Sequence, residues 1–248
     1  MFQKIEGFIL RTQDYGETHK IVTLLTREMG KMGAIARGAK KTRSRMAAIT
    51  QPFIHGDFLI QTGTGLGTIQ QGDVIHSHRK IREDIFLTAY ASYMVEMADK
   101  LTEQRKYYPG LMEELLEAMS RMESGQDPEI LASMFEWKMY NVAGFAPVVH
   151  QCVSCGNNEP YAAFSIQEGG LLCSRCRHVD SHAIPVSEQV AKLLRIFSMV
   201  HIRQVGNISI KPTNKELIRK IMDDYYDQYG GFHLKSKRFL QQMNKLKE

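Results

Sequence analysis

Residues 20–40 read KIVTLLTREMGKMGAIARGAK, two β-rich apolar runs separated by a turn at Gly30. Short apolar runs bounded by glycine and polar residues are typical of β-strands joined by tight turns. The second run leads directly into a loop that is rich in lysine and arginine. The pattern therefore predicts two adjacent strands of a small sheet, followed by a positively charged loop.

The flanking sequence contains three more runs of this kind, at residues 5–10, 53–61 and 68–75. A glycine-rich segment, residues 63–67, predicts a hairpin turn between the last two. Five short strands in about 80 residues suit a closed barrel better than a sandwich, which usually needs about seven strands. We therefore predict an OB-fold β-barrel over residues 1–80.

The period of the apolar pattern changes from two to about 3.6 after the barrel, which indicates helices. Apolar stripes run through residues 86–101, 111–122 and 130–145, and helical patterning resumes after residue 187. We predict an α-helical domain made of residues 81–149 and 182–248, with an insertion at residues 150–181. The predicted fold class is multidomain α+β, an N-terminal OB-fold barrel followed by an α-helical domain with an inserted four-cysteine zinc finger.

The insertion contains all four cysteines of the chain, as two Cys-x2-Cys pairs. Cys152 and Cys155 form the first pair, and Cys173 and Cys176 form the second. Two tight turns that each present two thiolates form a tetrahedral site with no position left for water. The spacing therefore predicts a structural Zn²⁺ ion bound by these four residues. Structural free thiols or a redox pair are the alternatives.

Charge is unevenly distributed, although the net charge is only +5. Residues 1–80 hold 12 Lys and Arg against 6 Asp and Glu, residues 81–150 hold 6 against 12, and residues 151–248 hold 14 against 9. This order of basic, acidic and basic segments predicts that the first and last parts face a polyanion while the middle does not.

The densest positive charge lies after the third predicted strand, where residues 37–45 include five basic and no acidic side chains. Such a cluster neutralises phosphates without reading sequence, and OB folds commonly bind single strands. A solubilising loop is the alternative interpretation. We predict a nucleic-acid-binding surface formed by Lys20, Lys31, Arg37, Lys40, Lys41, Arg43 and Arg45.

No motif predicts catalysis, so we expect that the chain is not an enzyme. The sequence has neither a Gly-x4-Gly-Lys-Ser/Thr phosphate loop nor a His-Glu-x-x-His pair. His76 and His78 lie on the same side of an extended stretch and could bind a metal ion. Because no carboxylate or cysteine is near them in the sequence, we predict instead an exposed strand end.

Several sequence features predict a cytoplasmic protein with no membrane contact. Lys4 and Glu6 interrupt the first apolar stretch, so it does not form a signal peptide. No uncharged apolar window of about 18 residues occurs that would predict a transmembrane helix. In the cytosol, four cysteines are more typical of metal binding or free thiols than of disulfides.

Short motifs along the first third of the chain match one known family. They are Tyr15-Gly16-Glu17, residues 20–26, Gly30-Lys31, residues 36–40 with Ser44-Arg45, Gln51-Pro52-Phe53 and residues 65–68. The order of barrel, helices, four-cysteine insertion and helices matches as well. On these grounds the chain resembles the bacterial recombination mediator family RecO.

This resemblance implies a non-enzymatic role in DNA repair and homologous recombination. It implies binding of single- and double-stranded DNA and annealing of complementary strands coated with single-strand-binding protein. The implied partners are RecR, the acidic C-terminal tail of single-strand-binding protein and, indirectly, the RecA filament that the protein helps to load. The implied location is the cytoplasm, in association with the nucleoid.

The main alternative is an RNA- or ribosome-associated OB-fold protein that binds zinc. Competition between DNA and structured RNA at matched salt distinguishes the two. A nuclease is a second alternative, which strand cleavage with magnesium or manganese would reveal. A structural adaptor is a third alternative, for which DNA affinity is incidental to the positive charge. The salt dependence of its DNA binding would stay the same after neutralisation of the basic loop.

Overall fold

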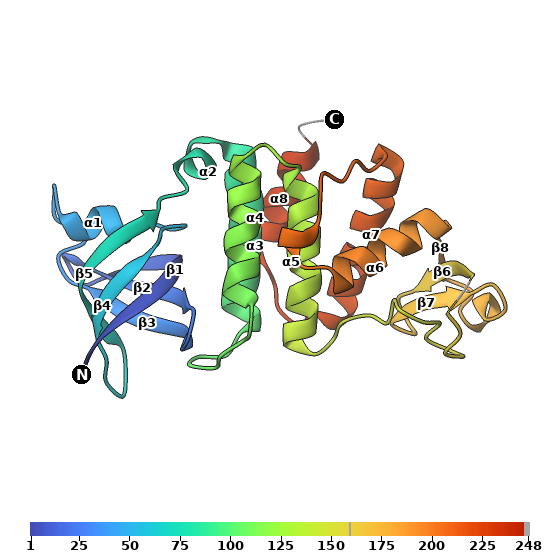
Figure 1. Cartoon of the computed structure of the whole chain (residues 1–248), viewed down its shortest axis with the longest axis horizontal. Helices are drawn as coiled ribbons and strands as arrows, with labels where there is room; N and C mark the ends of the chain where they lie inside the picture. The colour runs from blue at the N-terminus through green and yellow to red at the C-terminus, as the bar shows by residue number, and fades with distance from the viewer. Residues whose placement is uncertain (159, 246–248) are drawn as a thin grey trace. The chain divides into compact units, whose positions relative to one another are not determined.

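The first five strands close into a barrel in the order β1-β2-β3-β5-β4 (Figure 1). They are β1 (Phe2–Tyr15), β2 (His19–Thr26), β3 (Gly30–Ala36), β4 (His55–Gln61) and β5 (Gly67–His76). Neighbouring strands are antiparallel, except that β3 and β5 pair in parallel. A five-stranded barrel of this kind is OB-like, as predicted.

Alternating apolar side chains fill the interior of the barrel, as the period of two in each run predicts. Val22 and Leu24 on β2 and Phe58 and Ile60 on β4 are almost completely buried in this core. Strand β1 is longer than the predicted run at residues 5–10. Its register shifts near Ile9, so that its first half pairs with β4 and its second half pairs with β2.

The structure is a computed structural model that describes residues 1–158 and 160–245. One compact unit contains Met1–Pro128 together with the chain from Leu234 onward, and a second contains Glu129–His233. The last three residues of the predicted helical domain, 246–248, lie outside the described residues. The domain boundaries derived from the sequence remain predictions.

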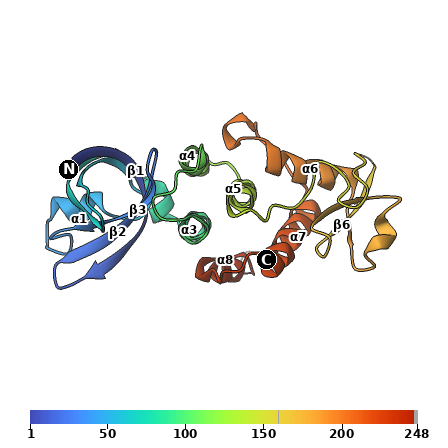
Figure 2. The same cartoon turned by 90° about the horizontal axis from the view of Figure 1, so that it is seen from below.

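The first unit also contains helices. They are α1 (Arg45–Ile49), α2 (Arg79–Glu83), α3 (Ile85–Leu101), α4 (Leu111–Glu123) and α8 (Lys235–Lys245). Helices α3 and α4 lie side by side and are seen end on in Figure 2. The Glu96 carboxylate on α3 accepts hydrogen bonds from the backbone N–H groups of Lys235 (3.2 Å) and Ser236 (2.7 Å). It thereby satisfies orphan donors at the start of α8 and holds that helix beside α3.

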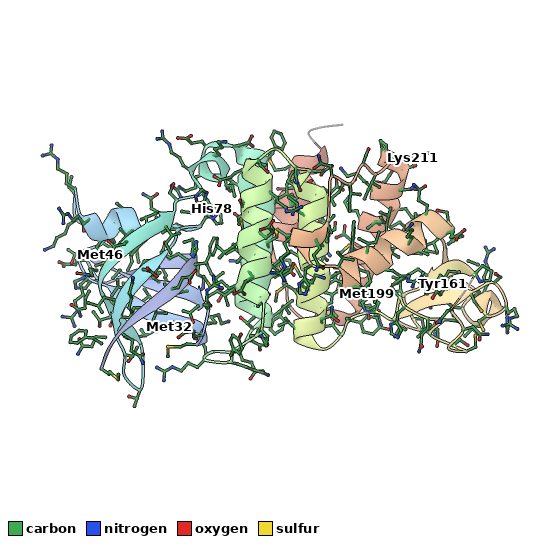
Figure 3. The ribbon with its side chains drawn as sticks, in the orientation of Figure 1. Met32, Met46, His78, Tyr161, Met199 and Lys211 are labelled. Atoms are coloured by element: carbon green, nitrogen blue, oxygen red, sulfur yellow. The ribbon has the colours of Figure 1, made fainter. Side chains whose placement is uncertain are left out.

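The second unit combines helices with a small sheet. Its elements are α5 (Pro128–Ala143), β6 (Tyr161–Ser165), β7 (Gly170–Cys173), the 3₁₀ helix η1 (Arg177–Val179), β8 (Ile184–Pro185), α6 (Glu188–Met199), η2 (Ile202–Gln204) and α7 (Pro212–Tyr229). The sheet has the order β7-β6-β8, and Figure 3 labels Tyr161 at the start of β6. The sequence does not predict this sheet, because the insertion has no sustained periodicity. The Ser187 hydroxyl caps α6 by accepting a hydrogen bond from the Val190 N–H.

The fold class predicted from the sequence is confirmed: a barrel is followed by helices, and the four-cysteine segment is inserted among them. No helix among the described residues has the combination of length and apolar composition that a bilayer crossing requires.

Candidate nucleic-acid interface and metal centre

The four predicted cysteine ligands form one cluster. The sulfur atoms of Cys152, Cys155, Cys173 and Cys176 all lie within 4.8 Å of one another, and none is in a disulfide. The Sγ atoms of Cys155 and Cys173, which come from different pairs, are 3.8 Å apart. Four thiols that converge in this way form a candidate metal site.

Local backbone hydrogen bonds hold the two cysteine pairs in place. The Gly156 N–H donates to the carbonyl of Cys152 at 2.9 Å, and Gly156 has a φ of +73°, which glycine adopts at little cost. At the end of β7 the Cys176 N–H donates to the Cys173 carbonyl at 3.0 Å. Each pair therefore lies on a tight turn that directs both sulfur atoms to the same side.

The cluster also replaces a hydrophobic core that the segment is too small to build. The buried residues at its centre are Cys152, Leu172 and Cys173, with only a few partly buried neighbours. Burial acts to raise the pKa of Cys152, but backbone N–H donors, first that of Cys173, lower it to about 6. The segment therefore provides a thiolate near neutral pH, which is the form of cysteine that binds metals.

The basic loop follows β3 and is anchored to the barrel from inside. Ala39 is buried in the barrel core, and Met46 on the short helix α1 (Arg45–Ile49) packs against the same core. The Lys40 N–H donates to the Thr18 carbonyl at 3.0 Å, and the Gly38 N–H donates to His19 Nδ1 at 3.0 Å. These contacts order the loop, whereas the sequence predicts only a long polar connection. Helix α1 has five residues, too few to show a helical period.

The anchored loop directs its basic side chains into solvent. Arg37, Lys40, Lys41, Arg43 and Arg45 are all exposed. In the part of the chain that the structure describes, four of them have no ion pair, and Lys40 alone pairs with a carboxylate, that of Asp14 at 2.9 Å. By contrast, Lys4 and Arg27 elsewhere on the barrel pair with Asp57 and Glu6. We call the five loop residues the basic loop cluster.

The two other predicted basic residues differ in their placement. Lys20 is half-buried on β2 and pairs in register with Asp14 and Ala36, so it lies beside the basic loop cluster. Lys31 is only 6% exposed, and its ammonium group contacts the Asp99 carboxylate at 3.5 Å as well as the Asp99 carbonyl. Burial lowers the pKa of Lys31, although Asp99 acts in the opposite direction. The structure thus brings Lys20 but not Lys31 to the basic surface.

One aromatic side chain near this surface is exposed. The sequence assigns no stacking role to Tyr15, Phe53 or Phe58, because alternation does not reveal which of them face outward. Phe53 and Phe58 are buried, but Tyr15 is 48% exposed at the end of β1. Tyr15 follows Asp14, the partner of Lys40, and pairs in register with His19. The pairing of the strands therefore places Tyr15 opposite His19, whose ring accepts a hydrogen bond from Gly38 in the basic loop.

A closed OB-like barrel with an exposed basic loop, joined to helices that carry a four-cysteine cluster, defines a class of nucleic-acid-binding protein. Residues 1–78 match the family model described as "Recombination protein O N terminal". Residues 82–238 match the model described as "Recombination protein O C terminal". The two matches together cover nearly all of the chain.

Several curated relatives carry the name DNA repair protein RecO. The one from Bacillus mycoides is 51% identical over 245 residues, 99% of each chain. The one from Bacillus pumilus is 50% identical over 248 residues, 100% of this chain and 97% of the relative, and that from Oceanobacillus iheyensis is 50% identical over 244 residues, 98% and 95%. The chain therefore belongs to the RecO family of DNA repair and recombination proteins, which are non-enzymatic recombination mediators. The family predicted from the sequence motifs is confirmed.

Proposed function

We propose that this protein binds single- and double-stranded DNA through the barrel and anneals complementary strands coated with single-strand-binding protein. With RecR as partner, it helps to load RecA onto the same strands, and it contacts the acidic tail of single-strand-binding protein. Membership of the RecO family supports these activities, and we propose on the same ground that the protein works at the nucleoid in the cytoplasm.

The observation that carries this proposal is the basic loop cluster. Its unpaired arginine and lysine side chains stand in solvent on a barrel of the type that binds single strands. Two DNA backbones repel each other, and a surface of exposed positive side chains lowers that repulsion while the bases stay free to pair. Tyr15 adds an exposed ring on which one base can stack.

Annealing requires no nucleotide hydrolysis in this scheme. Pairing of complementary strands is downhill, so the protein needs only to bring two backbones together and to displace or share the resident single-strand-binding protein. The positive loop meets both needs, because it competes for phosphates with counterions and with the coating protein.

We also propose that the four-cysteine cluster binds a structural Zn²⁺ ion. The edge of a regular tetrahedron with Zn–S bonds of about 2.3 Å is about 3.8 Å. The distance between the sulfur atoms of Cys155 and Cys173 is 3.8 Å, which agrees with that edge. The ion would tie the turn after α5 to the end of β7, and four sulfur ligands leave no position for a reacting water.

The test of the DNA proposal is annealing, without ATP, of two complementary strands that are each coated with single-strand-binding protein. The test variant carries alanine at the four unpaired positions, Arg37, Lys41, Arg43 and Arg45. A matched control carries alanine at four exposed basic residues outside the cluster, Arg79, Lys80, Lys100 and Lys106.

We expect the test variant to anneal at least about tenfold more slowly and its salt slope for single-stranded DNA to fall by about 2 to 3. The control should retain most of the activity. Equal losses of annealing rate in the two variants would show that only the net charge of the protein matters. That result would contradict the assignment of the basic loop cluster as the DNA-binding surface. Tighter binding to structured RNA than to DNA at matched salt would favour the RNA-binding alternative.

A further inference from the structure

The last residues of β5 meet the end of helix α4 in the first unit. His76 and His78 lie on the chain that leaves the barrel, and Glu123 is the last residue of α4. Figure 3 shows His78 at this connection. The sequence predicts an exposed strand end here, and it gives no sign that Glu123 is the carboxylate beside the two histidines. The fold supplies one from 45 residues away from His78.

One carboxylate oxygen of Glu123 contacts both imidazole rings. The distance from Oε2 to Nε2 of His76 is 2.6 Å, and the distance to Nδ1 of His78 is 3.0 Å. The two rings are packed edge to face, with centroids 4.2 Å apart. One nitrogen from each histidine and one carboxylate oxygen lie within 4.8 Å of one another.

We propose that His76, His78 and Glu123 form a second cation site, which binds a divalent ion of the zinc type. Two histidines and one glutamate are an established donor set for Zn²⁺, with a fourth position left for water. Zinc bonds of about 2.0–2.2 Å place neighbouring ligand atoms about 3.3–3.5 Å apart. The Glu123 oxygen, at 2.6 and 3.0 Å from the two histidine nitrogens, therefore needs to move away from them by less than about 1 Å to admit the ion.

The fold fixes which nitrogen of His78 can act as a ligand. The residue is 2% exposed, and Nδ1 is the nitrogen that faces the Glu123 carboxylate, at 3.0 Å. Nε2 has no hydrogen-bond partner in the part of the chain that the structure describes. Nδ1 is therefore the donor atom that His78 offers to an ion.

The buried histidine has an uncommon backbone conformation, and the other side of the site is open. His78 has φ 46° and ψ 45°, the left-handed conformation, at the start of α2. His76 is 52% exposed, so solvent reaches the fourth coordination position. The Lys80 ammonium group lies 3.4 Å from the backbone carbonyl oxygen of Glu123, whereas the Glu123 carboxylate contacts the two histidines.

A bound ion would connect the barrel to the helices. The segment from β5 to α2 is the covalent link between them, and Glu123 belongs to the more distant α4. The bound form therefore resists any motion that separates the end of β5 from the end of α4. This role differs from that of the four-cysteine cluster, which lies within the second unit.

The test is a zinc titration of the full-length protein after the four-cysteine cluster has been filled. We expect a further binding event of about one equivalent in the wild type, with a rise in melting temperature. His76→Ala and Glu123→Gln should each weaken this event by at least about 100-fold. Glutamine retains the shape of the glutamate side chain, and His76 is exposed, so both variants should fold. His233→Gln, at an exposed histidine outside the site, is the matched control and should bind as the wild type does.

Cobalt provides a second readout that separates the two sites. Co²⁺ at the four-cysteine cluster gives thiolate charge-transfer absorption, whereas Co²⁺ bound by nitrogen and oxygen gives only ligand-field bands. The second equivalent should add ligand-field bands without charge transfer, and both variants should lose them. The proposal is overturned if the wild type binds no second equivalent at saturating zinc, or if that equivalent persists in both variants.

Discussion

The ammonium group of Lys40 lies 2.9 Å from the carboxylate of Asp14, where the basic loop meets the end of β1. Lys40 lowers the pKa of Asp14, first by its hydrogen bond, and Lys20 adds a smaller effect of the same sign. Asp14 is therefore ionised at neutral pH and partly neutralises the basic loop cluster. The Asp14 carboxylate therefore competes with DNA phosphates for the ammonium group of Lys40.

Asp14→Asn should strengthen DNA binding, because it releases Lys40 for a phosphate. We expect an affinity increase of a few fold at low salt, and a salt slope steeper by at most about 1. Fluorescence anisotropy with a labelled single strand over a range of salt concentrations measures both. Asp57→Asn is the matched control, since Asp57 pairs with Lys4 on the barrel outside the loop. If Asp14→Asn binds no better than Asp57→Asn, Lys40 does not contact DNA.

Removal of one cysteine should abolish metal binding at the cluster. Cys155→Ser keeps an exposed position polar but deletes one of four ligands. We expect zinc released by a thiol-modifying reagent to fall from about one equivalent to nearly none. Amide exchange should accelerate throughout residues 150–181 while the barrel stays protected. Ser154→Ala, at the exposed neighbouring position, should behave as the wild type. Full protection of the segment in Cys155→Ser would contradict a structural metal.

The acid sensitivity of the barrel should depend on Glu6. Hydrogen bonds from Arg27, and then from His55, overcome desolvation and lower the pKa of Glu6 to about 2 from 4.5. Because the folded-state pKa is lowered, the stabilisation is fully present above about pH 4.5 and is lost as the pH falls toward 2. We expect Glu6→Gln to reduce the free energy of unfolding by about 1–2 kcal/mol at pH 7. Chemical denaturation at several pH values measures this.

Glu113→Gln provides the control for Glu6. Glu113 contacts the same Arg27 guanidinium, but its side chain is 48% exposed. Glu113→Gln should lower the free energy of unfolding by less than about 0.5 kcal/mol, because an exposed ion pair contributes little to stability. Between pH 4.5 and pH 2 the stability of Glu6→Gln should decline less steeply than that of the wild type. Parallel pH profiles for Glu6→Gln and the wild type would be inconsistent with the role of Glu6.

The turn between β2 and β3 should tolerate no side chain at Gly30. Gly30 has a φ of +67°, and a Cβ atom there would lie 1.8 Å from the carbonyl oxygen of Lys106. Gly30→Ala combines an unfavourable backbone conformation with a steric clash against the backbone of Lys106. We therefore expect the free energy of unfolding, measured by urea denaturation, to fall by at least about 2 kcal/mol. Gly63→Ala is the control, because no atom lies within 4 Å of its Cβ position. A loss below about 0.5 kcal/mol for Gly30→Ala would contradict this close approach.

Local patterns in the sequence were sufficient to predict the strands of the barrel, the main helices and the four-cysteine cluster. The alternation that includes Val22 and Leu24 marks a strand because successive side chains point to opposite faces. The Cys-x2-Cys spacing marks a metal site because a tight turn directs both sulfur atoms to one side. The basic loop is also evident, since its five charges lie close together in the sequence. Each of these features depends on residues only a few positions apart.

Tertiary structure alone decided which distant groups meet. Lys31 has the sequence context of the other basic residues, but Asp99, on a helix 68 residues away, binds and buries it. Glu123 reaches His76 and His78 only because α4 ends where β5 does. These encounters depend on the closure of the barrel and the packing of helices against it. No local period in the sequence encodes that long-range geometry, so it had to be read from the folded chain.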